Sequence, residues 1–182
     1  MGEFQASIAE IRNRARRHIE EGPVTAGYKA DREKVISVLN EVLATEIVCV
    51  LRYKRHYYMA QGIHAEPVAQ EFLQHAQEEQ THADMVAKRI VQLRGKPNFN
   101  PAGLAERSHS EYVEGNSLVE MIREDLVAER IAIESYSEII RWLGNDDSTT
   151  RVLLEQILKA EEEHADDLSN MLATLDPEKP PH

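Results

Sequence analysis

Four stretches of the chain carry apolar residues at the spacing of one helix face, and glycine or proline bounds each stretch. The pattern predicts helices over about residues 31–61, 66–95, 117–144 and 147–174. The sequence shows no alternating strand pattern, so we expect an all-α protein. Helices of this length are about 40–45 Å long at 1.5 Å per residue. In a chain of 182 residues, four such apolar faces can be buried only against one another.

The connections indicate how these helices are arranged. Short turns join the first pair and the last pair, so each pair is expected to form an antiparallel hairpin. The connection between the pairs, GKPNFNPAGLAERSHSEYVEGN at 95–116, is long enough to run the full length of a bundle. We therefore predict a four-helix bundle with one long crossover, preceded by a short charged helix over about residues 4–21. The predicted organisation is an N-terminal extension at 1–28, the bundle at 29–175 and a loose tail at 176–182.

Ionisable residues interrupt all four apolar stripes. The segment EEQTHAD at 78–84 places a carboxylate and an imidazole three residues apart where the stripe requires apolar side chains, and the fourth helix repeats this spacing. Counted from the hairpin turns, the interruptions lie at one depth, roughly 20 Å along each helix. Buried charges are costly unless they are paired or bind a metal. The interrupting residues are Glu46, Glu79, His82, Glu129, Glu161 and His164.

Four carboxylates and two imidazoles at one level suit two metal ions. One glutamate from each of two helices and a Glu-x-x-His pair from each of the other two is the di-iron carboxylate arrangement of helix bundles. Oxygen and nitrogen ligands favour iron or manganese, and zinc could compete. A third such pair, Glu106 and His109, falls in the crossover and is interpreted as a chance match. The alternative for the six residues is a set of surface or water-bridged polar groups.

The segments that carry these residues resemble the ferritin superfamily, specifically bacterioferritins and the related Dps-like, thioferritin-type proteins. The resemblance covers about residues 31–174 and is carried by LATEIVCVLRYKRHYYMAQG, EEQTHADMVAKRI, MIREDLVAERIAIESY and ILKAEEEHADDL. It implies that Glu46 and Glu129 are terminal ligands, and that Glu79 and Glu161 bridge two irons. By the same resemblance, His82 and His164 would bind one iron each, and Tyr53, seven residues after Glu46, would lie beside the site.

The sequence also departs from the bacterioferritin pattern. Bacterioferritins have a haem-ligating methionine directly after the second-helix glutamate, and this chain has Gln80 there, so haem is not expected. We expect no counterpart of the short fifth helix that the 24-subunit cages have. The resemblance therefore implies a homo-oligomeric shell that is a dodecamer rather than a 24-mer. Thioferritins have a cysteine pair near the metals, whereas this chain has only Cys49, which we interpret as core packing.

Composition restricts the partners. The net charge of −11 argues against nucleic-acid binding by the surface as a whole, and no apolar run is long enough to cross a membrane. A single cysteine and a charged N-terminus without a signal-peptide pattern predict a cytoplasmic protein. The arginines of IRNRARRHIE could contact DNA, but a helix that docks on a neighbouring subunit is the preferred interpretation. His75, one turn before Glu79, is interpreted as a surface or hydrogen-bonded histidine rather than a site residue.

The resulting hypothesis is a ferroxidase that oxidises Fe(II) to Fe(III) with O2 or H2O2 at a centre of two irons per subunit. Its role would be iron storage and protection against oxidative stress, with Fe(III) deposited inside the shell. Two alternatives remain open at this point. One is a di-metal peroxidase or manganese catalase, which would use similar ligands. The other is a Dps-type shell protein that protects DNA.

Overall fold

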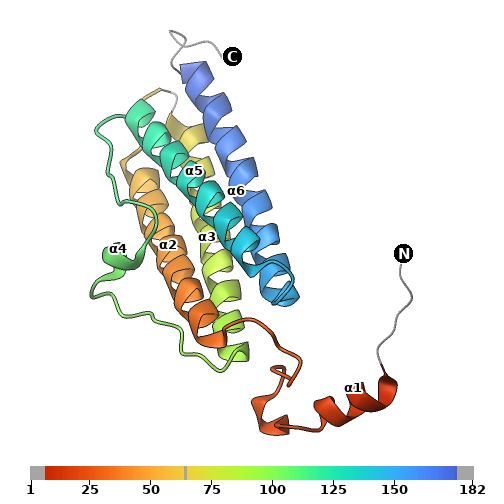
Figure 1. Cartoon of the computed structure of the whole chain (residues 1–182). Helices are drawn as coiled ribbons and strands as arrows, with labels where there is room; N and C mark the ends of the chain where they lie inside the picture. The colour runs from red at the N-terminus through yellow and green to blue at the C-terminus, as the bar shows by residue number, and fades with distance from the viewer. Residues whose placement is uncertain (1–6, 64, 176–182) are drawn as a thin grey trace, which may run out of the picture.

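The computed structural model describes residues 7–63 and 65–175, and within them the chain is all-helical (Figure 1). The predicted four-helix bundle with one long crossover is confirmed, and α2, α3, α5 and α6 are its long helices. The predicted loose tail at 176–182 lies outside the described residues. The elements are α1 (Ile8–Ala15), the 3-10 turn η1 (Ile19–Glu21), α2 (Arg32–Met59), α3 (Ala65–Gln92), α4 (Leu104–Arg107), α5 (Leu118–Leu143) and α6 (Ser148–Leu175).

Local signals set the ends of the long helices. Asp31 caps α2 by accepting a hydrogen bond from the backbone N–H of Lys34 at 3.3 Å. Ser117 caps α5 in the same way, with the N–H of Glu120 as donor at 3.2 Å. Gly144 ends α5 with a φ of 51°, in the left-handed region that favours glycine. Because these signals are local, the predicted bounds differ from the observed ones by no more than three residues.

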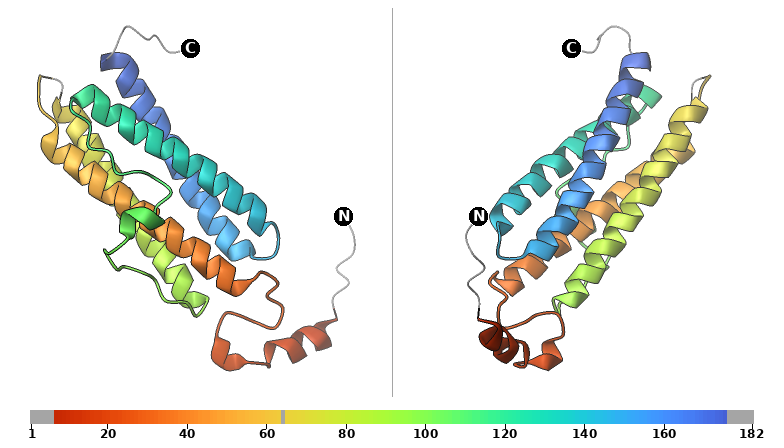
Figure 2. Two further views of the ribbon diagram at one scale, coloured as in Figure 1. Left: turned by 60° about the vertical axis from the view of Figure 1, so that its left-hand side comes forward. Right: turned by 90° about the vertical axis from the view of Figure 1, so that its right-hand side faces the viewer.

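The long helices form two antiparallel hairpins packed on each other, α2 with α3 and α5 with α6 (Figures 1 and 2). The crossover leaves the end of α3, passes along α2 through the short helix α4, and reaches the start of α5 at the opposite end of the bundle. Within the described residues, no helix has an apolar stretch long enough to span a bilayer.

The N-terminal helix is shorter than the sequence predicted. A helix was expected over about residues 4–21, but α1 covers only Ile8–Ala15, and residues 4–6 lie outside the described part. His18 then adopts a left-handed φ of 52°, and η1 follows it. None of the α1 residues is buried. A helix without an apolar face to bury gains little from tertiary packing, which explains the early end.

Two apolar clusters fill the bundle, one on each side of a polar layer. The first cluster includes Leu39 and Val42 of α2, and the second includes Phe72 of α3 and Leu168 of α6. Along each long helix, the interrupting ionisable residues lie between the positions that contribute to the two clusters. The fold therefore positions these residues in the interior, midway along the bundle.

Candidate metal centre

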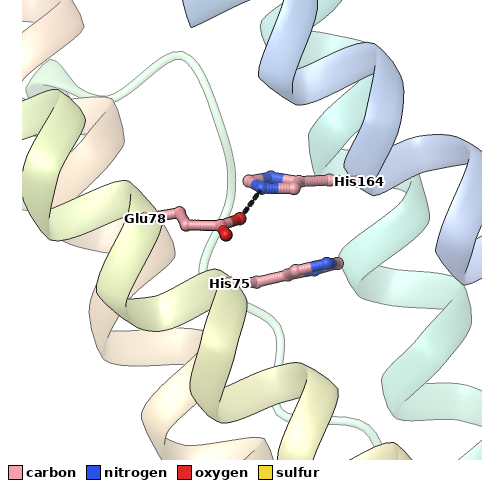
Figure 3. Close-up of side chains that lie close together, drawn as sticks. All are labelled: His75, Glu78 and His164. Carbon is pink, nitrogen blue, oxygen red and sulfur yellow. Dashed lines mark hydrogen bonds and ion pairs between the residues drawn. The ribbon is translucent and has the colours of Figure 1, made fainter.

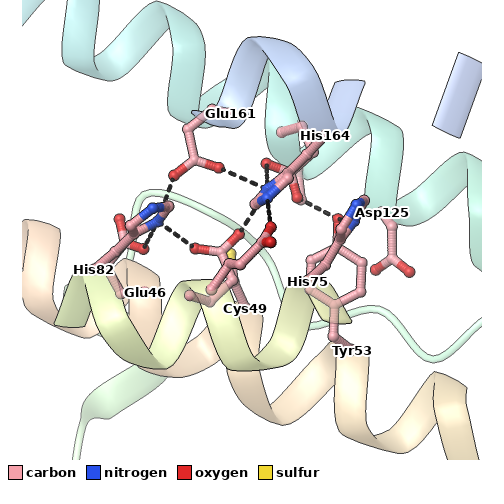
Figure 4. A network of polar contacts seen from close by, with 12 residues as sticks. Glu46, Cys49, Tyr53, His75, His82, Asp125, Glu161 and His164 are labelled. Carbon is pink, nitrogen blue, oxygen red and sulfur yellow. Dashed lines mark hydrogen bonds and ion pairs between the residues drawn. The ribbon is translucent and has the colours of Figure 1, made fainter. Parts of the chain in front are cut away.

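The bundle brings all six interrupting residues together, and we refer to them as the six-residue cluster. Each of the four carboxylate residues is 1% exposed, and the two histidines are 3% and 7% exposed. Figure 4 shows four of them, Glu46, His82, Glu161 and His164, converging from separate helices on one interior region. Glu46 lies on α2, Glu79 and His82 on α3, Glu129 on α5, and Glu161 and His164 on α6.

Glu79 and Glu161 divide their carboxylate oxygens between the two imidazoles. The Nδ1 atom of His82 lies 3.3 Å from Oε2 of Glu79 and 3.2 Å from Oε1 of Glu161. The Nδ1 atom of His164 lies 3.5 Å from Oε1 of Glu79 and 3.4 Å from Oε2 of Glu161. Each carboxylate thus presents one oxygen to each side, as a bridging ligand would.

Glu46 and Glu129 each belong to one side only. An oxygen of Glu46 lies 3.4 Å from Nδ1 of His82, and an oxygen of Glu129 lies 3.8 Å from Nδ1 of His164. The result is two sets of four metal-ligand residues that share Glu79 and Glu161. Within each set the ligand atoms lie within 4.8 Å of one another. This is the division that two terminal and two bridging carboxylates require.

The cluster is electrostatically strained unless cations occupy it. Burial raises the pKa of the Glu46 carboxyl well above its ordinary value, and the nearby charge of Glu79 raises it further. Burial alone would lower the pKa of His82, but the carboxylates of Glu161 and Glu46 outweigh burial and raise it to about 12. Protons are therefore held in the cluster when metal is absent, and metal ions would compete with them.

Two buried tyrosines hold Glu129 and Glu46. The Tyr53 hydroxyl donates to Glu129, and the Tyr136 hydroxyl donates to Glu46. Tyr53 was expected beside the site, whereas the role of Tyr136 was missed. The signal was present in the sequence, since Tyr136 follows Glu129 by seven residues just as Tyr53 follows Glu46.

Two residues outside the six-residue cluster, Glu78 and His75, lie against His164 (Figure 3). The Nε2 atom of His164 is hydrogen-bonded to Glu78 at 2.6 Å, which leaves Nδ1 facing the cluster. The His75 ring is 1% exposed and stacks on the His164 ring with a centroid distance of 4.0 Å. The interpretation of His75 as a hydrogen-bonded histidine therefore agrees with the structure, which also packs its ring against a member of the cluster.

The residues present fit two divalent cations. Several buried atoms of the cluster have no hydrogen-bond partner among the described residues, and buried acceptors without partners are costly. Four carboxylates also balance the charge of two divalent ions. The unpartnered atoms are Oε2 of Glu46, Oε1 of Glu79, Oε2 of Glu129, both carboxylate oxygens of Glu161 and Nδ1 of His164.

Two other sequence features belong to neither metal-ligand set. His109 approaches Glu41 at 3.5 Å, and the pair that it forms with Glu106 belongs to neither set of donors. Cys49 is buried, and its Sγ atom accepts a weak hydrogen bond from the Nη2 atom of Arg52 at 3.6 Å. Burial raises the pKa of the Cys49 thiol well above its ordinary value, so the thiol is not a reactive thiolate.

Comparison with known proteins identifies relatives over most of the chain. The ferritin family, described as a ferritin-like domain, matches residues 36–177. A bacterioferritin of Mycobacterium leprae is 31% identical over 142 residues, which cover 78% of this chain and 85% of that protein. A dodecameric thioferritin, the bacterioferritin-related protein from Bacteroides fragilis, superposes with a TM-score of 0.77 at 32% identity, covering 81% of this chain and 89% of that one. The bacterioferritin of Desulfovibrio desulfuricans, whose structures describe a diiron site in different catalytic states, gives a TM-score of 0.71 at 25% identity and covers 80% and 82% of the two chains.

Proposed function

The chain belongs to the ferritin family, in its bacterioferritin-related branch, and from that premise we propose that it is a ferroxidase. It binds two Fe(II) ions at the six-residue cluster, oxidises them and passes Fe(III) to a store inside a shell of identical subunits. The observation that carries the proposal is the division of the Glu79 and Glu161 oxygens between two sets of donors.

Iron is the substrate in this reaction, and electrons balance between iron and oxygen. Two Fe(II) ions each lose one electron, and O2 takes up these two electrons and two protons to become H2O2. With H2O2 as the oxidant, the same electrons and two protons give two molecules of water. Two-metal centres perform such chemistry when the protein holds the ions about 3.5–4 Å apart with open coordination positions.

The protein holds and orients the ligand atoms. Tyr53 and Tyr136 each donate to one oxygen of a terminal carboxylate and leave the other oxygen for a metal. Glu78 takes the Nε2–H of His164, so the Nδ1 lone pair is directed at the cluster. The apolar clusters on both sides limit the access of bulk water.

Iron stoichiometry tests the assignment. After anaerobic titration with Fe(II), stopped-flow oxidation is expected to show a fast phase that accounts for two irons per chain, those of the six-residue cluster. Glu79→Ala and His164→Ala are expected to bind fewer irons and to lose the fast phase, because each removes a donor from the cluster. Glu106→Ala is the matched control, since it alters the exposed glutamate of the third Glu-x-x-His pair. Fast oxidation in Glu79→Ala at the wild-type rate would refute the proposal.

We also propose that the subunits assemble into a closed homo-oligomer, with a dodecamer favoured. The Bacteroides fragilis relative is dodecameric, and this chain leaves large apolar side chains exposed on its long helices. Tyr58 on α2 is 77% exposed and Trp142 on α5 is 50% exposed. Sedimentation equilibrium is expected to give a mass near twelve times the 20.7 kDa chain. A monomer or dimer at micromolar concentration would contradict this assembly.

A further inference from the structure

A second group of metal-ligand side chains lies beside the six-residue cluster but shares no residue with it. Glu71 and His75 lie on α3, one turn apart, and Asp167 lies on α6. Each offers one ligand atom, and the three atoms lie within 4.8 Å of one another. Glu71 is half-buried, His75 is buried and Asp167 is exposed.

Hydrogen bonding determines which nitrogen of His75 carries a proton. The single hydroxyl proton of Tyr53 goes to Glu129, so the Tyr53 oxygen can only accept from a neighbouring donor. The Nδ1 atom of His75 lies 3.2 Å from that oxygen, and Nδ1–H is therefore the donor. In the neutral ring, this leaves a bare lone pair on Nε2.

Within the described part of the chain, the polar groups near Nε2 are carboxylates rather than hydrogen-bond donors. Oε1 of Glu71 lies 3.3 Å from Nε2, and the Asp167 carboxylate completes the group. Among the described residues, Nε2 of His75 has no hydrogen-bond partner, although the side chain is 1% exposed. Three acceptors that face one another without a donor repel each other, and a bound cation removes this repulsion.

We propose that Glu71, His75 and Asp167 form a third divalent-cation site of this chain. One imidazole nitrogen and two carboxylate oxygens, with room for water as the remaining ligands, suit a first-row transition metal ion. A competing set is His75, Glu78 and His164. It is a poorer set, because Nε2 of His164 is already engaged by Glu78 at 2.6 Å.

The third site lies between solvent and the six-residue cluster. Glu71 and Asp167 line a groove of ≈ 440 Å³ between α3 and α6, together with apolar residues such as Val68 and Met171. On its other side, the His75 ring stacks on His164 at 4.0 Å between ring centroids (Figures 3 and 4). A cation held here is therefore adjacent to the centre. We assign this site the role of holding Fe(II) on the way to that centre. This role rests on the proposed function, whereas cation binding at the site does not.

Co(II) tests the site without any turnover. Crystals of the full-length protein soaked in Co(II) are expected to show three anomalous peaks per chain, two in the six-residue cluster and one at Glu71, His75 and Asp167. Equilibrium dialysis is expected to give three Co(II) per chain. Glu71→Gln and Asp167→Asn are expected to remove the third peak and to lower the dialysis count to two, with the cluster peaks unchanged. Asp166→Asn is the matched control, an exposed aspartate one residue away with the same change in charge, and it is expected to keep all three.

The outcomes test the third site and the ferroxidase assignment independently. Two cluster peaks without a third, at saturating Co(II), overturn the third site and leave the proposed function intact. This is also the result expected if a proton alone bridges His75 and Glu71. A third peak with an empty six-residue cluster supports the third site and overturns the proposed centre. A third peak that persists in both Glu71→Gln and Asp167→Asn overturns the assigned ligands.

Discussion

Tyr136 is an aromatic residue with one polar atom in the middle of a bundle core. Burial raises the pKa of its phenol well above the ordinary value, and the charge of Glu46 raises it further, so the phenol remains a donor. Its hydroxyl donates to Glu46, and Tyr53 forms the equivalent bond with Glu129 across the cluster. The two tyrosines therefore restrict the positions of the Glu46 and Glu129 carboxylates.

Tyr136→Phe is predicted to weaken both folding and metal binding. It leaves a second oxygen of Glu46 without a partner, and an unsatisfied buried acceptor costs about 1–3 kcal/mol of unfolding free energy. A residue that hydrogen-bonds to a metal ligand orients that ligand, and loss of such a bond typically lowers metal affinity about 10–100-fold. Urea denaturation and Co(II) titration measure the two effects, with Tyr58→Phe as the exposed control. Equal stability and affinity in Tyr136→Phe and wild type would show that the hydrogen bond is unimportant.

At the scale of elements, α2 binds both α5 and the crossover through one buried network. Arg52 donates from Nε to Asp125 at 2.7 Å and from Nη1 to the Glu111 carbonyl at 2.9 Å. The ring nitrogens of His56 lie 2.7 Å from Asp125 and 2.9 Å from the Glu114 carbonyl. The long crossover is thus fixed against the bundle by side chains of α2.

Asp125→Ala is predicted to destabilise the fold strongly. It leaves Arg52, which is 0% exposed, without its carboxylate partner, and breaking a buried pair costs about 3–5 kcal/mol. Urea denaturation measures the loss, and Asp146→Ala in the exposed α5–α6 turn is the control. A loss below about 1 kcal/mol, the range of surface ion pairs, would contradict this account of the network.

At the scale of the whole molecule, a polar layer divides the apolar core, and its charge must be neutralised. In the metal-free protein, the pKa of His82 is raised from 6.5 to about 12, and that of Glu46 lies well above 4.5. At pH values between the ordinary and the raised pKa of these groups, the folded chain therefore binds more protons than the unfolded chain. The contribution of His82 to stability is complete below about pH 6.5 and is lost as the pH rises toward 12. The contribution of Glu46 is complete below about pH 4.5 and declines above it.

The metal-free protein is accordingly predicted to become less stable between about pH 6 and pH 9. Metal ions replace the protons, so the stabilisation by Co(II) is predicted to increase over the same range. Scanning calorimetry of chelated and Co(II)-loaded protein at three pH values in this range measures both trends. A metal-free protein whose Tm rises toward pH 9 would show that the cluster does not hold protons as described.

Much of this molecule could be predicted from sequence, because the determining signals are local. Helix periodicity, with glycine or proline at the bounds of each apolar stretch, gave the ends of the four long helices within three residues. The common depth of the cluster followed from residue counts, since helix rise is constant. The N-terminal helix was overestimated, because α1 lacks the buried face that would extend it.

The sequence by itself determined that four helices form and that six ionisable side chains lie at one level along them. Only the tertiary structure decided which atoms meet. Helix periodicity gives the face on which His75 lies, but its burial against His164 and its contact with Tyr53 depend on how α3 packs on α6 and α2. The same packing divides the oxygens of Glu79 and Glu161 between two imidazoles. Side-chain chemistry between helices depends on ångström differences in helix packing, which spacing along one helix does not specify.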